Sequence, residues 1–277
     1  MEKWITSFDG TPIHYDIEKG KKSDACLIFV HGIGGDLAAW NRERHYFHKK
    51  GFSTLALDLR GHGKSGRPHL SSDYGLTYFA KDLYMIIRHE KIKKFILIGH
   101  CFGGIITTMF HKLHPRLAKA YILIDTTFKA PEPLRTLFSN YSLVRHFLNL
   151  LLKNKHLGRR KESPVDYGKF VGTGDYDLKR IYSDITHTSF KSWILTFQNL
   201  AHFNGIRILK SITQPVLIVE GEKDSIFNVL KAQKIHDLVK GSTLRIIPNE
   251  NHIIVLNNPD VLVKEISSFL QSIGIEE

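Results

Sequence analysis

The chain has 277 residues, of which 42% are hydrophobic and 24% are charged. These values are typical of a globular protein, and the length suits one core with an insertion better than two full domains. No run approaches the ~18 apolar residues of a membrane span, so we expect no integral membrane association. The net charge of +12 is spread along the chain apart from a cluster at 153–163, without any nucleic-acid-binding signature. Nucleic acid is therefore not an expected partner.

The cysteine count indicates the compartment. The chain has two cysteines, Cys26 and Cys101, too few for a disulfide framework. The first residues, MEKWITSFDG, lack the apolar core of a secretory signal. We therefore expect a cytoplasmic protein with two reduced thiols.

Short apolar runs alternate with helical patterns along the chain. An N-terminal hairpin is indicated by Asp9-Gly10 between two short strand patterns. The later runs lack polar alternation, as parallel strands buried on both faces do; they are 25–30, 53–58, 94–99, 120–125, 215–221 and 243–248. Helical periodicity is clearest at 76–90 and 259–272. The alternation predicts an α/β fold, with a doubly wound, mostly parallel sheet of about eight strands.

The alternation is interrupted once. Between Asp125 and about Ser211, no run resembles a strand. Helical patterns at 134–152 and 189–203 flank a glycine-rich loop at 167–177. We therefore predict a core made of residues 1–128 and 209–277, with a helical cap (lid) made of residues 129–208.

The stretch GHCFGG, residues 99–104, follows one predicted strand and precedes a helical pattern. Its glycines remove Cβ atoms from a tight strand-to-helix turn, so Cys101 should project from the corner. At a helix N-terminus the helix dipole would lower the pKa of the Cys101 thiol and favour the nucleophilic thiolate. A small structural cysteine in a glycine-rich turn is the alternative for this stretch taken alone.

Three other strand-end segments supply what a nucleophilic cysteine needs. VHGIGGD (30–36) should place the backbone N–H of Ile33 opposite that of Phe102, as a two-donor oxyanion hole. EGEKDSIF (220–227) offers Asp224 as the acid, with Glu222 as a less favoured neighbour. NENHIIVLNNP (249–259) offers His252 as the base.

These motifs, together with the DLRGHGKSG turn (58–66), resemble the α/β-hydrolase-fold superfamily over nearly the whole chain. The resemblance is specific for the fold and much weaker for the substrate. It also makes Asp125 an alternative acid, since some members use that strand end. Most members carry serine at the position of Cys101, but cysteine nucleophiles occur in dienelactone hydrolases and polyhydroxyalkanoate synthases. Overall the chain looks like a small capped esterase.

The motifs predict a Cys101–His252–Asp224 triad in a hydrolase or acyltransferase of the esterase or thioesterase type. The partner would be a small-molecule acyl substrate, and the chemistry calls for no cofactor. The spacing of His and Cys predicts no metal site. Candidate lining residues of an acyl pocket are Phe128, Leu137, Phe138, Phe147, Trp193 and Phe197. The alternative is a hydrolase-fold protein that binds a ligand without turning it over.

Overall fold

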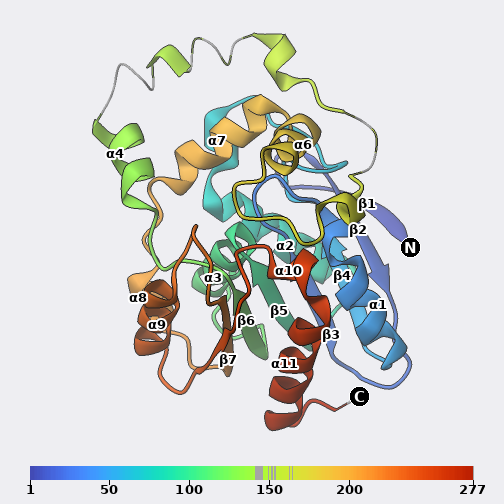
Figure 1. The fold of residues 1–277 in the computed structure, drawn as a ribbon. Coiled ribbons are helices and arrows are strands. Elements are labelled where there is room, and N and C mark those ends of the chain that lie inside the picture. The colour runs from blue at the N-terminus through green and yellow to red at the C-terminus, as the bar shows by residue number, and fades with distance from the viewer. Residues whose placement is uncertain are drawn as a thin grey trace.

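The computed structural model describes residues 1–140, 146–148, 150, 152, 154–161, 163 and 165–276. The strands of its sheet are β1 (Glu2–Thr6), β2 (Pro12–Glu18), β3 (Cys26–Val30), β4 (Ser53–Leu57), β5 (Phe95–His100), β6 (Ala120–Ile124), β7 (Val216–Gly221) and β8 (Thr243–Ile247). They form one eight-stranded sheet in the order β1-β2-β4-β3-β5-β6-β7-β8 (Figure 1). β2 is antiparallel to both of its neighbours, and the remaining pairs are parallel. The predicted α/β fold with a mostly parallel sheet of about eight strands is confirmed.

Helices cover both faces of this sheet. The α-helices are α1 (Asn41–Lys49), α2 (Leu76–His89), α3 (Phe102–Leu113), α4 (Glu132–Asn140), α6 (Leu178–Thr188), α7 (Phe190–Leu200), α8 (Ile206–Leu209), α9 (Val229–Leu238), α10 (Ile254–Asn257) and α11 (Pro259–Ser272). Short 3₁₀ helices are η1 (Leu37–Trp40), η2 (Ser71–Tyr74), η3 (Lys155–Gly158) and η4 (Tyr167–Phe170). Apolar side chains of α2, α3, α8 and α9 pack on one face, and those of α1, α10 and α11 pack on the other.

The central strands explain the continuous apolar runs of the sequence. All five residues of β3 are buried. Ile28 and Val30 belong to the core on one face, whereas Leu27 and Phe29 belong to the core on the other. Because successive side chains of a strand point to opposite faces, a strand covered on both sides has no position left for polar residues. Burial of each such side chain contributes about 1.5–3 kcal/mol.

Other predicted elements can be compared directly. The N-terminal hairpin is present, with Gly10 at a φ of 85° in its turn. The helices predicted at 76–90 and 259–272 correspond to α2 and α11. The helix predicted at 134–152 overlaps α4, but several of its residues lie outside the described part of the chain.

Residues 129–208, called the insertion below, separate β6 from β7. Among their described positions the structure contains α4, α6, α7 and the beginning of α8, and no strand; one isolated bridge joins Lys129 to Asn204. In Figure 1, helices α6 and α7 lie in the upper middle of the view, and α4 lies at the left. Five residues of interest follow the carboxyl ends of parallel strands, either directly or in the next loop: His31, Cys101, Asp125, Asp224 and His252. Parallel topology brings these ends to one edge of the sheet, where α/β proteins bind their ligands.

Candidate active site

Cys101 lies at the corner between β5 and α3. Its φ of 52° is in the left-handed region, which non-glycine residues seldom adopt. Its N–H donates a hydrogen bond to the Ile124 carbonyl at 2.9 Å, and its carbonyl oxygen accepts one from the Thr126 hydroxyl at 2.7 Å. Strained backbone of this kind persists only where the surroundings fix it, and it is common at functional sites.

Glycines permit the close approach of α3 to the sheet. A Cβ atom at Gly99 would lie 2.4 Å from the carbonyl oxygen of Gly103. A Cβ atom at Gly103 would lie 2.0 Å from the carbonyl oxygen of Val30. Both obstacles are backbone atoms, which could move only if the helix or the strand moved with them. The corner therefore requires glycine at both positions.

His252 and Asp224 are joined by a short hydrogen bond. The distance between Nδ1 of His252 and Oδ2 of Asp224 is 2.7 Å. The other oxygen of Asp224 accepts hydrogen bonds from the N–H groups of Ile226 and Phe227, each at 2.7 Å. Three donors around one buried carboxylate stabilise its ionised form. Asp224 thereby holds the proton of His252 on Nδ1 and leaves Nε2 for a second partner.

Cys101 is close enough to His252 to act on its charge. Burial by itself lowers the pKa of His252, but the thiolate charge of Cys101 opposes this effect, as do hydrogen bonds to Asp224 and Cys101. Together they raise the pKa of His252 well above its ordinary value. The structure thus brings the three predicted triad residues into one connected arrangement. The cationic imidazole of His252 is favoured when Cys101 is negatively charged.

The loop after β3 lies against Cys101. A Cβ atom at Gly32 would lie 3.1 Å from Cβ and 3.7 Å from Sγ of Cys101. Ile33 follows directly in this loop, and Phe102 is the first residue of α3, where N–H groups have no intrahelical acceptor. The two amides expected to form the oxyanion hole therefore belong to the residue after Gly32 and to the residue after Cys101.

Two buried histidines near the site hold its loops. His31 bridges two loops, since Nδ1 donates to the Gly32 carbonyl at 2.7 Å and Nε2 accepts from the Leu59 N–H at 3.0 Å. His100 donates from Nε2 to the carbonyl oxygen of His252 at 2.8 Å. Burial lowers the pKa of His100 to about 3, so its ring is neutral at pH 7. His100 therefore fixes the backbone of His252 without adding a charge.

The two alternative acids form other hydrogen bonds than one to the His252 ring. Glu222 is exposed, and its carboxylate accepts a hydrogen bond from the N–H of Asn249 at 2.9 Å. Asp125 is fully buried, and its Oδ1 accepts a hydrogen bond from the Gly221 N–H at 2.8 Å. Asp224 is the acid that hydrogen-bonds the His252 ring.

Asp175 is a residue that the sequence analysis missed. It comes from the glycine-rich loop of the insertion and is buried. Its Oδ1 accepts a hydrogen bond from the His252 N–H at 2.9 Å. Its Oδ2 accepts two from Ser225, at 2.8 Å from the N–H and 2.6 Å from the hydroxyl. One carboxylate thus clamps the loop that carries His252 to the loop that carries Asp224.

Helix α6 places the insertion directly on the loop after β3. A Cβ atom at Gly34 would lie 2.6 Å from Cβ of Asp184, and the Thr188 hydroxyl donates to the Gly34 carbonyl at 3.2 Å. A small cavity of about 50 Å³ remains there, lined among others by Ile33, Arg180 and Asp184. The insertion therefore covers the expected oxyanion loop as well as the His252 loop.

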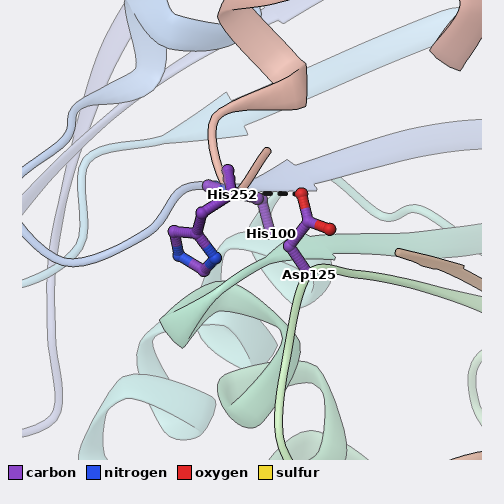
Figure 2. A group of neighbouring side chains, drawn as sticks. All are labelled: His100, Asp125 and His252. Carbon is purple, nitrogen blue, oxygen red and sulfur yellow. Dashed lines mark hydrogen bonds and ion pairs between the residues drawn. The ribbon is translucent and has the colours of Figure 1, made fainter. Parts of the chain in front are cut away.

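Among the residues that the structure describes, two groups of side chains are close enough to be considered for a metal ion. The first is His100, Asp125 and His252, where Asp125 Oδ2 lies 4.0 Å from His100 Nε2 (Figure 2). Its nitrogens are already committed, because His100 Nε2 donates to a carbonyl and His252 Nδ1 donates to Asp224. We therefore assign no metal to this group. The second group is Asp125, Glu220 and Asp224, which is considered separately below.

The six candidate pocket residues differ in exposure. Phe138 is buried, and Phe128 and Phe197 pack against the main core. The rings of Trp193 and Phe197 are in edge contact, with their centroids 4.4 Å apart. Leu137 and Phe147 are 39% and 60% exposed, respectively. The described structure therefore places Phe128, Phe138 and the Trp193–Phe197 pair in packed surroundings, whereas Leu137 is partly exposed and Phe147 is mostly exposed.

Comparison with known proteins identifies the fold family of the chain. Residues 26–259 match the family described as alpha/beta hydrolase fold. Protein ABHD8 from Bos taurus is 27% identical over 274 residues, which cover 93% of this chain and 60% of that protein. The chain thus spans about 60% of the length of these first relatives. The non-heme chloroperoxidase of Burkholderia pyrrocinia is 27% identical, with 97% and 99% of the two chains covered.

A solved structure of similar shape supports the fold. It comes from work on carboxylesterases of Nitrososphaera gargenis and has a TM-score of 0.75, 21% identity and 98% coverage of both chains. At this identity the likeness concerns the fold alone. Within the described residues, no helix is both long and apolar enough to cross a bilayer.

Proposed function

Because the chain belongs to the α/β-hydrolase family, we propose that it hydrolyses a carboxylic ester or thioester, or transfers its acyl group, through Cys101. The observations that carry this proposal are the hydrogen bond between Asp224 and His252 and the nearby Cys101, whose charge raises the pKa of His252. Relatives with the same fold are named esterases, which supports the substrate class.

The reaction would begin with attack of the Cys101 sulfur on the carbonyl carbon of the substrate. His252 takes the thiol proton, and Asp224 stabilises the resulting imidazolium. The C=O π electrons move onto the carbonyl oxygen, which accepts hydrogen bonds from the N–H groups of Ile33 and Phe102. The C–O or C–S bond to the leaving group then breaks, and His252 returns its proton to that group.

The product of this first half is an acyl thioester on Cys101. Water, activated by His252, adds to the acyl carbon, and collapse of the adduct releases the acid and restores the thiol. An alcohol or thiol in place of water would give acyl transfer instead. These steps need no cofactor. Since a thiolate also departs easily from a tetrahedral adduct, esters and thioesters with good leaving groups are more suitable substrates than amides.

The insertion would serve as the lid of this site. Its helix α6 contacts the loop after β3 through Asp184 and Thr188, and its Asp175 clamps the His252 loop. We therefore assign the acyl pocket to the apolar side of the insertion that faces the core. Trp193 and Phe197, which pack against each other, are its main candidate lining residues.

The deciding experiment is intact-mass detection of an acyl adduct across a panel of esters and thioesters. We expect a mass increase equal to the acyl group, lost in Cys101→Ala and kept in Cys26→Ala, whose cysteine is buried in β3. Cys101→Ser should retain some esterase activity, because His252 and the backbone donors remain. A full rate in Cys101→Ala would refute the nucleophile assignment. Binding without adduct or turnover would favour a ligand-binding protein.

A further inference from the structure

Glu220 is a buried acid in β7 that the proposed reaction does not use. It is 0% exposed, and neither of its carboxyl oxygens has a hydrogen-bond partner in the described part of the chain. An ionised carboxylate in such surroundings is strongly disfavoured, because it has lost its water and gained no donor. Glu220 therefore requires either a proton or a cation.

Two further carboxyl groups share its surroundings. One oxygen each from Asp125, Glu220 and Asp224 lies within 4.8 Å of the other two. All three residues are buried. Three negative charges at this separation, away from solvent, repel one another strongly, and carboxyl groups so placed retain protons. The cluster as a whole must therefore carry fewer than three charges.

The hydrogen bonds indicate which group keeps its proton. Asp224 accepts three, from the His252 ring and from the amides of Ile226 and Phe227. Asp125 accepts one, from the amide of Gly221. Glu220 accepts none. Since donors stabilise the ionised form, the charge belongs on Asp224 and a proton belongs on Glu220.

We propose that Glu220 is a positioning residue that stays protonated in the folded protein and donates its acid proton to the carboxylate of Asp224. The assignment rests on the proposed function, because Asp224 matters as the acid of that triad. The charged or titratable groups that face Glu220 are Asp125, Asp224 and His252. Burial, together with the charges of Asp125 and Asp224, raises the pKa of Glu220 to about 10.

The role of this proton is to limit the negative charge behind His252. A hydrogen bond from Glu220 withdraws electron density from Asp224, whereas an ionised Glu220 would add a second negative charge nearby. The added charge would stabilise the imidazolium of His252 and make its proton harder to return to the leaving group. A neutral Glu220 thus keeps His252 able both to accept and to release a proton.

A bound cation is the other way to neutralise these oxygens. We favour the proton because His252 faces the same carboxyl groups and already supplies a positive charge when it is protonated. The two possibilities differ in their response to added ions, so one set of measurements separates them.

The test compares Glu220→Gln with Glu222→Gln. Glutamine has the shape of a protonated glutamic acid and keeps a donor, while Glu222 is an exposed acid two residues further on. In the unfolded wild type, Glu220 releases its proton above its ordinary pKa of 4.5, whereas the folded protein keeps it until about pH 10. As pH rises through this window, the stability of the wild type should therefore fall. This contribution to the fall should be missing in Glu220→Gln, which has no acid proton to release at this position.

We expect the Tm of Glu220→Gln, minus that of the wild type, to grow as pH rises through this window. For Glu222→Gln the difference should stay constant. The pH profile of kcat should be the same in Glu220→Gln and the wild type, while Glu220→Ala, which lacks a donor, should have a shifted profile. A Tm difference independent of pH, or a shifted profile in Glu220→Gln, would overturn the proposal. So would a wild-type Tm that rises with added calcium or sodium and does not rise in Glu220→Gln.

A second measurement does not depend on the folding of that variant. Isotope-labelled glutamate distinguishes glutamic acid from aspartic acid in the infrared spectrum. Glu43, also buried, has its pKa raised to about 8 by burial, so it is first replaced by glutamine. A labelled, protonated acid band at neutral pH is then expected from Glu220, and its absence would contradict the proposal. Neither this band nor the Tm differences require turnover, so the absence of esterase activity would refute the proposed function alone.

Discussion

The hydroxyl of Thr126 donates a hydrogen bond to the carbonyl oxygen of Cys101 at 2.7 Å. Thr126 is buried, and a Cβ atom at Gly104 would lie only 2.6 Å from its Oγ1, so its side chain is closely packed against α3. The segment that follows β6 thereby holds the strained backbone of Cys101 in place.

Replacing Thr126 with valine should test this restraint. Valine has nearly the same shape but no donor, and the Cys101 carbonyl would keep only its contact with the Gly104 N–H at 3.1 Å. We expect a loss of about 1 kcal/mol in the free energy of unfolding and a lower kcat. Denaturant unfolding and steady-state kinetics measure the two effects. In the control, Thr127→Val, a hydroxyl bonded to the Lys129 carbonyl is lost instead, and kcat should not change. Equal kcat values in both variants would argue against the restraint.

Alkylation should separate the two cysteines. Burial raises the pKa of Cys26 to about 12, and its side chain is 3% exposed, so it should resist iodoacetamide. Cys101 is half-buried and is one of the groups that raise the pKa of His252. We expect modification of Cys101 well below pH ~8.5, the free-thiol reference. Peptide mass mapping gives the site and the rate.

The variant His252→Ala should slow this alkylation, whereas His202→Ala, at an exposed histidine, should not. If Cys101 stayed unreactive at neutral pH and His252→Ala changed nothing, the ion pair would not exist. The ligand-binding alternative would then be preferred over the enzyme.

The fold could be predicted because each strand buried on both faces appears in the sequence as a continuous apolar run. A strand such as β5, buried on both faces, reads as an uninterrupted apolar run, and its end is marked by the GHCFGG turn. The sequence order of the motifs then places Cys101, Asp224 and His252 at one sheet edge, and the structure brings them together. Their catalytic roles stay predictions.

The supporting residues could not be found in the same way. Asp175 lies 77 residues from His252 and 50 from Ser225, so its clamp depends on how the insertion folds back onto the core. Glu220 is a single acid at the end of an apolar strand, where sequence alone does not distinguish a solvated edge from a buried carboxyl cluster. Both depend on long-range packing rather than on any local pattern.

Acid should destabilise the protein through its buried histidines. Burial and the nearby charge of His31 lower the pKa of His62 to about 3, against an ordinary value of 6.5. Between these values the unfolded chain binds a proton that the folded chain does not, so stability falls as pH falls from 6.5 toward 3. This one residue contributes about 1.4 kcal/mol per pH unit across that window.

The variant His62→Gln should have a shallower fall in unfolding free energy, measured by denaturant titration at several pH values. His69→Gln, at an exposed histidine, is the control and should retain the wild-type slope. A slope unchanged in His62→Gln would mean that His62 is protonated in the folded state after all.

The last prediction concerns chain length. Trp193 and Phe197 form an edge contact on α7, and Phe197 also packs against the main core, so truncation of either ring should leave space inside the protein. If the insertion forms the acyl pocket, Trp193→Ala and Phe197→Ala should shift kcat/KM in favour of longer acyl chains, on the order of tenfold. Tyr182→Ala, at a ring 62% exposed on α6, should leave the preference unchanged. The iodoacetamide rate at Cys101 should be the same in all three variants, because the rings would bind the acyl group and not ionise the thiol. A chain-length preference identical in all three would place the pocket elsewhere, whereas a changed alkylation rate would mean that the rings support the triad itself.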